Sequence, residues 1–175
     1  NRLFGFTNST FVFIATSNSS HAALAKQAMN AGKHVIIEKP AATSESDAAF
    51  LVDLARRKKL SLMVDHMMTG NSWNIKARDM VARNALGKVN DACFHMEFAY
   101  GGTPEEAATW RCADPAELGG PIGDVGSHCL YMAEFILGGK VRELSCSYIP
   151  KTLNINVEDG AIIKFILDNG IKGSA

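Results

Sequence analysis

Short apolar runs alternate with amphipathic segments in the first third of the chain. The apolar runs, rich in strand-forming residues, are 11–15 ("FVFIA"), 34–37 ("HVII") and 60–64 ("LSLMV"). Between them, residues 21–31 and 44–59 repeat small and apolar side chains at helical spacing. Strand–helix–strand units at this spacing are typical of parallel sheets, and uninterrupted apolar strands suit a sheet covered on both faces. The pattern therefore predicts three neighbouring parallel strands in one half of a doubly wound domain.

Both predicted helices carry residues that are typical of helix ends. Gly32 stands where a helix C-terminal glycine belongs, and Ser44 is followed three residues later by Asp47, as in a capping box. The basic run at residues 56–59 ("RRKK") closes the second helix, where cations complement the helix dipole. We interpret this run as a solvated helix end and not as a binding patch.

The pattern changes after residue 65. Residues 73–86 are predicted to form a helix closed by Gly87, and residues 92–100 alternate between an apolar, aromatic face and a mixed face. Two further strands are predicted at 144–148 and 161–167, and the sequence "DNG" that follows the second is a strong hairpin signal. These features predict a largely antiparallel sheet.

The predicted fold class is therefore α/β, with two incomplete domains. Residues 1–65 would form the parallel-sheet domain, and residues 66–175 an α+β domain with the largely antiparallel sheet. The first residue is Asn1, not Met, and the last residues begin a strand, so both ends look cut from a longer protein. The absence of a targeting signal therefore decides little.

Composition excludes several classes of protein. Hydrophobic residues make up 47% of the 175 residues, which is inconsistent with disorder, and the formal net charge of zero gives no basic footprint for nucleic acid. No apolar run approaches the roughly 18 residues that suggest a membrane span. Cys93, Cys112, Cys129 and Cys146 match no zinc or redox spacing, so we expect no metal site. We interpret them as reduced, half-buried core thiols, which favours a reducing compartment and a cytoplasmic location.

The first candidate site is the polar end of the second strand. In open parallel sheets ligands bind at the carboxyl ends of strands, and this strand delivers Glu38 and Lys39 to that edge before Pro40 fixes the backbone. A lysine at a partly dry edge can serve in proton transfer. The alternative is a solvated strand end with a surface ion pair.

The second candidate site is the stretch "GDVGSHCLY", residues 123–131. On an α-helix Asp124 and His128 share a face, with Tyr131 about one turn further. A carboxylate beside an imidazole can orient the ring, and the nearby glycines would let backbone approach a ligand closely. The alternative is an N-cap aspartate followed by an ordinary helix histidine.

Together the two stretches resemble the Gfo/Idh/MocA oxidoreductases. The stretch "ATSNSSHAALAKQAMNAGKHVIIEKPAATS" is similar to the second half of that family's Rossmann-type nucleotide-binding domain. The stretch "WRCADPAELGGPIGDVGSHCLYMAEFILGG" is similar to its substrate-domain signature. The resemblance extends from about Phe11 to Lys172, with both motifs in the expected order.

The resemblance implies hydride transfer between NAD or NADP and a carbinol of a sugar, polyol or related small molecule. His128 would take or return the hydroxyl proton, Lys39 would stabilise the alkoxide, and Asp124 would help to hold the substrate and the imidazole. The residues implied to bind the cofactor are Thr16, Asn18, His21, Glu38, Lys39 and Pro40. The residues implied to line the substrate pocket are Trp110, Arg111 and Tyr131.

Three departures from the family pattern bear on this prediction. The GxGxxG loop that grips the pyrophosphate is missing, as is the residue that selects NAD or NADP, so this segment alone should bind cofactor poorly. Pro121 replaces the third glycine of the usual triplet and would stiffen the loop. Tyr131 replaces a common aspartate, which changes the side chain that the substrate meets.

Two alternatives to a sugar dehydrogenase share the fold. One is a member that binds ligand or partner without turnover, as repressors of the family do, and the other is a dihydrodiol or biliverdin-type reductase. Lys39, Asp124 and His128 argue for an enzyme, because a pure binder needs none of them. The resemblance also implies a cis Lys39–Pro40 bond and a homo-oligomer. The apolar face of residues 92–100 is the predicted interface, unless it packs on the helix of residues 121–137.

Overall fold

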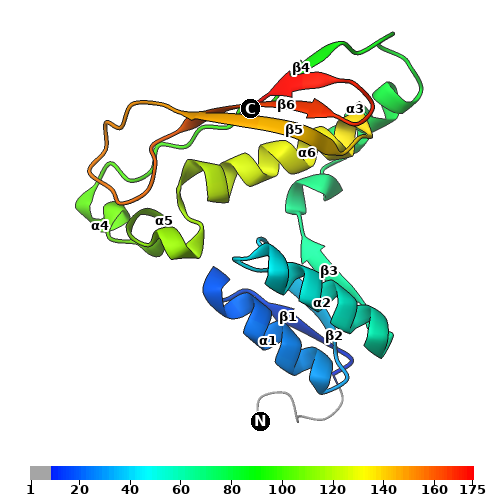
Figure 1. The fold of residues 1–175 in the computed structure, drawn as a ribbon, viewed down its shortest axis with the longest axis vertical. Coiled ribbons are helices and arrows are strands. Elements are labelled where there is room, and N and C mark those ends of the chain that lie inside the picture. Colours follow the sequence, from blue (N-terminus) through cyan, green and yellow to red (C-terminus); the bar gives the residue numbers. More distant parts are fainter. Residues whose placement is uncertain (1–8) are drawn as a thin grey trace. The chain divides into compact units, whose positions relative to one another are not determined.

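The computed structural model describes residues 9–175, shown in Figure 1. These residues form two compact units, the first ending at His66 and the second beginning at Met67. Each unit has its own sheet, one of three strands and one of four. The assignment of residues 1–65 and 66–175 to two incomplete domains stays a prediction.

The first unit is a parallel βαβαβ arrangement. Its elements are β1 (Phe11–Ile14), α1 (Asn18–Asn30), β2 (His34–Glu38), α2 (Glu45–Lys58) and β3 (Leu62–Asp65). The strands lie in the order β1-β2-β3, and both neighbouring pairs are parallel. The predicted trio of neighbouring parallel strands is confirmed.

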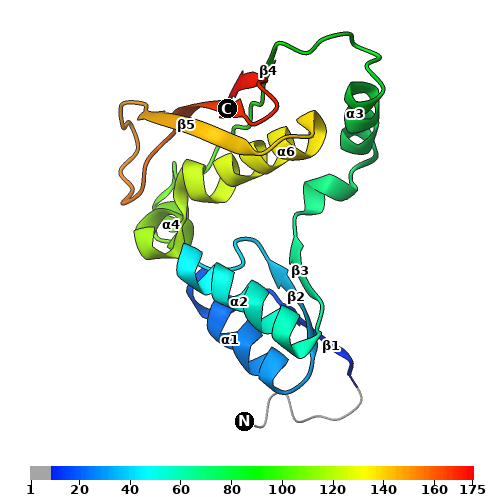
Figure 2. The ribbon, with the colours of Figure 1, turned by 45° about the vertical axis from the view of Figure 1, so that its right-hand side comes forward.

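Both helices of this unit cover the same face of the sheet, as Figure 2 shows. Ile14, Val35 and Ile37 on the covered face are buried, and they pack with small and apolar residues of α1 and α2. On the other face, Phe13 and Met63 flank Ile36 in register and are 51% and 56% exposed. The expectation of a sheet covered on both faces is therefore not met by the described residues.

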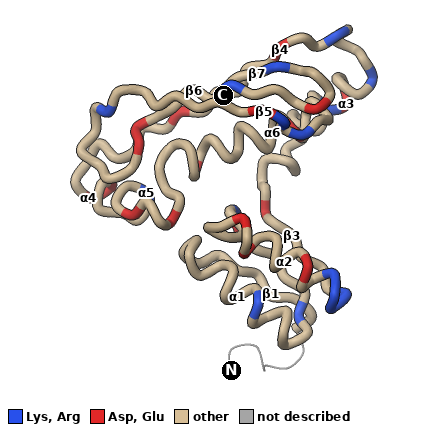
Figure 3. Tube along the Cα trace, viewed as in Figure 1, with Lys and Arg blue, Asp and Glu red and all other residues tan. Residues whose placement is uncertain are grey.

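The predicted helix ends are observed. The Ser44 hydroxyl oxygen accepts a hydrogen bond from the Asp47 backbone N–H at 3.1 Å, and Ser44 is the N-cap of α2. Gly32 follows α1 with a φ of 75°, in the left-handed region that favours glycine. The basic run closes α2, and Figure 3 shows the cluster of basic residues at that helix end. It complements the C-terminal end of the helix dipole.

The second unit joins several short helices to a mostly antiparallel sheet. Its helices are η1 (Met67–Gly70), α3 (Ser72–Ala82), α4 (Pro104–Ala107), α5 (Trp110–Ala113), η2 (Pro115–Glu117), the π-helical η3 (Pro121–Gly126) and α6 (Ser127–Leu137). Its strands are β4 (Asp91–Cys93), β5 (Val141–Tyr148), β6 (Ala161–Leu167) and β7 (Lys172–Ser174), in the order β4-β7-β6-β5. Only the β4–β7 pair is parallel. The predicted fold class is confirmed.

Helix α6 packs on one face of this sheet. Ala133 and Leu137 of α6 are buried with Phe165 and Leu167 of β6. The hairpin predicted from "DNG" joins β6 to β7, and the Leu167 N–H donates to the Ile171 carbonyl at 2.9 Å. None of the helices within residues 9–175 has the length and hydropathy needed to cross a bilayer.

Two predicted elements are shorter than expected. The helix predicted over residues 73–86 ends at Ala82, and Asn84 has a φ of 56°, which interrupts helical geometry. The strand predicted over residues 92–100 is only β4, because its partner β7 has three residues. The Phe94 N–H still donates to Ser174, at 2.9 Å, after which the ladder ends.

The apolar face predicted for residues 92–100 is partly internal. Ala92 and Phe94 pack against the buried cluster that α6 shares with β6. The expectation that this face forms an interface is therefore wrong for these two residues. Packing on the helix, the alternative considered for it, is what the structure shows there.

Candidate active site

In the first unit, the predicted cofactor residues follow two adjacent strands. Thr16 and Asn18 come after β1, and Lys39 and Pro40 come after β2. The register pairs Ile14 with Ile37, so both strand ends lie at one edge of the sheet. Thr16 is exposed and Asn18 is buried, whereas Glu38, Lys39 and Pro40 are half-buried. The Lys39–Pro40 peptide bond is cis, as predicted.

Polar contacts order the start of α1 at this edge. The Thr16 and Ser20 hydroxyl oxygens lie 2.6 Å apart, and the Ser20 hydroxyl donates to the Ser17 carbonyl at 2.7 Å. Ser17 is the N-cap of α1, and its side chain makes no capping hydrogen bond. The N-terminus of a 13-residue helix thus lies at the edge where ligands bind in parallel sheets.

The side chain of His21, a residue of α1, is fully buried, with 0% exposure. Its Nδ1 lies 2.8 Å from the Pro40 carbonyl oxygen, and its Nε2 lies 3.1 Å from the Thr16 carbonyl oxygen. Both ring nitrogens therefore contact the protein's own backbone. These contacts do not support the prediction that His21 touches the cofactor.

In the second unit, the glycine-rich stretch is packed against the protein itself. A Cβ at Gly119 would lie 2.3 Å from the Arg111 carbonyl oxygen, and a Cβ at Gly123 would lie 2.1 Å from the Leu118 carbonyl oxygen. Gly120 has a φ of 77°, and a Cβ added there would lie 2.8 Å from the Glu158 carboxylate. The sequence interpretation assigned these glycines to a ligand. The structure uses them for close approach within the chain.

Asp124 and His128 lie on one continuous helical segment whose geometry changes between them. Asp124 is in the π-helical turn η3, and His128 is in the first turn of α6. The π geometry pairs residues five apart, so the simple α-helical spacing of four does not apply across this junction. Both residues are half-buried, and Tyr131, further along α6, is 36% exposed.

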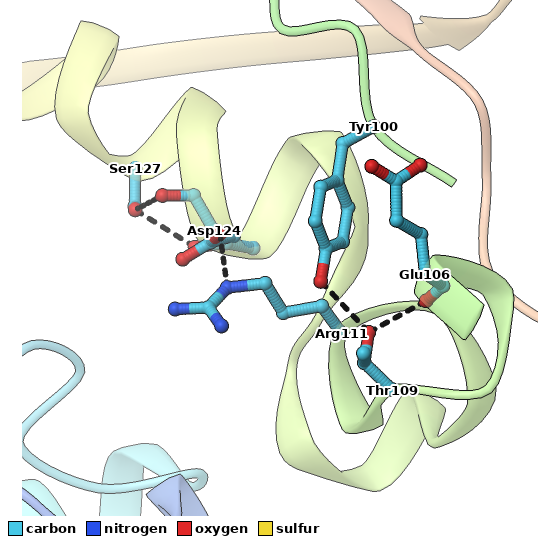
Figure 4. A network of polar contacts seen from close by, with 7 residues as sticks. Tyr100, Glu106, Thr109, Arg111, Asp124 and Ser127 are labelled. Atoms are coloured by element: carbon cyan, nitrogen blue, oxygen red, sulfur yellow. Dashed lines mark hydrogen bonds and ion pairs between the residues drawn. The ribbon is translucent and has the colours of Figure 1, made fainter. Parts of the chain in front are cut away.

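The structure brings Asp124 together with two predicted substrate residues. The Arg111 Nε donates to Asp124 Oδ2 at 3.0 Å, as Figure 4 shows. The same guanidinium lies over the Trp110 ring, 4.3 Å from its centre. Because the Asp124 side chain is only 25% exposed, this ion pair is partly shielded from solvent. Arg111 therefore orients the Asp124 carboxylate.

Further polar contacts fix the loops around this ion pair (Figure 4). The Ser127 hydroxyl donates to the Gly123 carbonyl at 2.8 Å. The Thr109 hydroxyl donates to the Glu106 carbonyl at 2.7 Å and lies 3.1 Å from the Tyr100 hydroxyl. The Thr109 contacts thus hold the segment directly before α5, the helix that carries Arg111.

Sequence reasoning missed Glu158. Its Oε1 accepts a hydrogen bond from the Ile122 backbone N–H at 2.9 Å, near the start of the helical segment that carries Asp124 and His128. A carboxylate at a helix N-terminus is stabilising, because it complements the helix dipole. The two residues are 36 positions apart, so no local motif could have paired them.

The cysteines do not build a second chemical site. All four are free, with Cys112 and Cys129 buried and Cys93 and Cys146 exposed, so the expectation of half-buried thiols is wrong. Burial, and then the nearby Cys93, raise the pKa of the Cys129 thiol, which disfavours its reactive thiolate. Within residues 9–175, no group of three or more His, Cys, Asp or Glu is arranged to hold a metal ion.

Comparison with known proteins identifies both units. Residues 3–66 match an oxidoreductase family with an NAD-binding Rossmann fold, and residues 74–175 match the GFO/IDH/MocA C-terminal domain. An uncharacterized oxidoreductase of Bacillus subtilis, YfiI, is 30% identical over 93% of this chain and 44% of its own length. A levoglucosan dehydrogenase of Pseudarthrobacter phenanthrenivorans is 27% identical over 86% of this chain and 42% of its own length.

Solved structures give the same result. An inositol dehydrogenase homolog from Azotobacter vinelandii, complexed with NADH and myo-inositol, is 30% identical with a TM-score of 0.76. The match covers 94% of this chain and 43% of that one. The chain therefore spans a little under half the length of these relatives. From both family matches together with the fold, the chain belongs to the GFO/IDH/MocA family of oxidoreductases.

Proposed function

We propose that this chain contributes to an NAD-dependent oxidoreductase that acts on a carbinol or carbonyl group of a sugar, polyol or related small molecule. The observation that carries the proposal is the placement of Lys39 directly after β2, at the carboxyl ends of the parallel strands, and of Asp124 and His128 on the helical segment formed by η3 and α6. The levoglucosan dehydrogenase and the structure with NADH and myo-inositol support the substrate class.

The sheet edge of the first unit fits the nicotinamide end of NAD. Thr16, Asn18, Glu38, Lys39 and Pro40 surround the two strand ends, beside the N-terminus of α1. When bound, the nicotinamide supplies or accepts a hydride. The protein's part is to hold that ring at the edge, to keep water away from it and to manage the proton of the substrate hydroxyl.

The residues of both units have distinct roles in this proposal. His128 takes the hydroxyl proton in oxidation and returns it in reduction. The positive charge of Lys39 stabilises the alkoxide that develops on the substrate. Asp124, fixed by Arg111, helps to hold the substrate, and Trp110 and Tyr131 contribute apolar and hydroxyl contacts to it.

The reaction is tested by mixing the full-length protein and NAD with a panel of cyclic sugars and polyols. We expect NADH absorbance to appear with at least one of them. A protein that binds NAD but turns over no member of a broad panel would favour the non-catalytic class. Activity on dihydrodiols alone would favour the dihydrodiol or biliverdin-type reductases.

The 175-residue segment is the matched control for cofactor binding. It holds the nicotinamide edge but has no GxGxxG loop for the pyrophosphate, so calorimetry should give a much weaker affinity for NAD than the full-length protein has. Equal affinities would show that the cofactor site is misplaced.

We also propose that the protein is a homo-oligomer that pairs through the outer face of the second sheet. Asp91, Glu143, Lys164 and Lys172 are exposed and line one shallow groove on this face, beside Ile162, which is 52% exposed. A two-fold axis through such a face can place the acidic side chains of one copy against the basic ones of the other.

Sedimentation of the full-length protein tests this interface. We expect an oligomer at micromolar concentration, and Lys164→Glu should shift it towards monomer because like charges then meet. Lys151→Glu, an exposed change outside the groove, is the control. A monomeric unmodified protein would contradict the proposal. A cytoplasmic location remains part of the proposal and rests on the four free thiols.

A further inference from the structure

His21 connects the two loops that form the cofactor edge of the first unit. One loop follows β1 and contains Thr16, and the other follows β2 and contains Pro40. The His21 ring lies between their backbones, with Nδ1 at 2.8 Å from the Pro40 carbonyl oxygen and Nε2 at 3.1 Å from the Thr16 carbonyl oxygen.

The ring is placed too deep for a direct contact with a ligand. Its exposure is 0%, and it is among the largest fully buried side chains of the described residues. Each of the two carbonyl groups belongs to a residue that is itself implied to face the nicotinamide. The second of these carbonyl groups is that of Pro40, which is bonded directly to Lys39.

We propose that His21 is a positioning residue, which sets the spacing of the Thr16 loop and the Lys39–Pro40 loop: its ring lies between one carbonyl oxygen of each loop and, when neutral, donates a hydrogen bond to one of them. This inference deepens the proposed function and rests on it for the identity of the ligand. A change in spacing of about 1 Å at a reacting centre can cost about 100-fold in rate, so a clasp of this kind affects binding and turnover without touching substrate.

The alternative is a buried histidine that only fills space and satisfies its own polar atoms. The two roles differ in what happens when one contact is kept and the other is lost. An asparagine side-chain amide nitrogen can take the place of Nδ1, and a glutamine one can take the place of Nε2. His21→Asn can therefore retain the contact to Pro40, and His21→Gln the contact to Thr16.

The first experiment measures NADH affinity by fluorescence titration of the full-length protein. We expect His21→Leu, which keeps an apolar side chain but loses both contacts, to weaken affinity by about 10–100-fold, as for other residues that orient a site from behind. His21→Asn and His21→Gln should lie between His21→Leu and the unmodified protein. If His21→Leu fails to fold, these two variants still test the clasp.

A stability-matched control separates positioning from general destabilisation. Leu51, which is 1% exposed, belongs to the apolar core of the first unit and has no polar atom to hold either loop. The control is Leu51→Val or Leu51→Ala, whichever matches the melting temperature of the His21 variant. Its NADH affinity should stay within about 3-fold of that of the unmodified protein, because a protein that remains stable enough to fold keeps its binding site. Equal losses of affinity in the His21 and Leu51 variants would overturn the proposal.

Hydrogen exchange on the full-length protein without cofactor tests the clasp independently of any activity. In the His21 variants, exchange should rise at residues 15–17 and 39–42 while the strands keep their protection. A uniform rise over the whole first unit would overturn the clasp. If the unmodified full-length protein fails to bind NADH, the proposed function is wrong, whereas localised exchange would still support His21 as the link between the loops.

Discussion

Replacing His128 by alanine is expected to lower the turnover of the full-length protein by about 10²–10⁴-fold, the usual contribution of a general acid–base group. Lys39→Ala should cost at least as much, because it removes both a positive charge and a donor aimed at the developing alkoxide. Lys39 is half-buried at the strand end, and His128 is half-buried in the first turn of α6. Neither side chain belongs to a buried apolar cluster, so the loss should be chemical and not a loss of folding.

Steady-state kinetics and NADH titration together distinguish the two roles. NADH affinity should change little for His128→Ala and more for Lys39→Ala, since Lys39 lies at the nicotinamide edge. The controls are Lys26→Ala, a lysine that lies over the Phe50 ring on the helical surface, and His95→Ala, whose side chain is 72% exposed. Undiminished activity of His128→Ala across sugar and polyol substrates would contradict the assigned role.

The second large effect is expected from Gly123→Ala. The added Cβ would lie 2.1 Å from the Leu118 carbonyl oxygen, a backbone atom that cannot rotate away. Leu118 is itself in the left-handed region, with a φ of 52°, so the turn has little room to adjust. We expect a loss of about 1–3 kcal/mol or more in the free energy of unfolding, typical of an overpacked site. Asp124 is the next residue, so activity should fall as well.

Chemical denaturation measures this effect, with Gly102→Ala as the matched control. A Cβ at Gly102 meets nothing within 4 Å, and its φ is not in the left-handed region. Its substitution should change stability by no more than about 0.5 kcal/mol. Equal stability of the two variants would show that the close approach at Gly123 is not a constraint on the fold.

Local sequence determined the elements of the first unit and the edge that they form. Strand runs and helical spacing repeat over a few residues, so three neighbouring parallel strands could be predicted from them, and the structure shows their order to be β1-β2-β3. Ser44 was identifiable as a cap because its partner, Asp47, is three residues away. Lys39 could be placed at the carboxyl end of a strand because locating that strand required only local sequence.

Tertiary structure decided the contacts between distant residues. The partners of His21 are 5 and 19 residues away, and the carboxylate that meets Ile122 comes from Glu158, 36 residues away. The role of Gly123 depends on which backbone atom lies beside it, and the length of β4 depends on the length of β7. Local propensity carries no information about such neighbours. Sequence alone thus determined which groups are available for chemistry, whereas packing decided which of them hold the others in place, because only packing brings remote segments within hydrogen-bond distance.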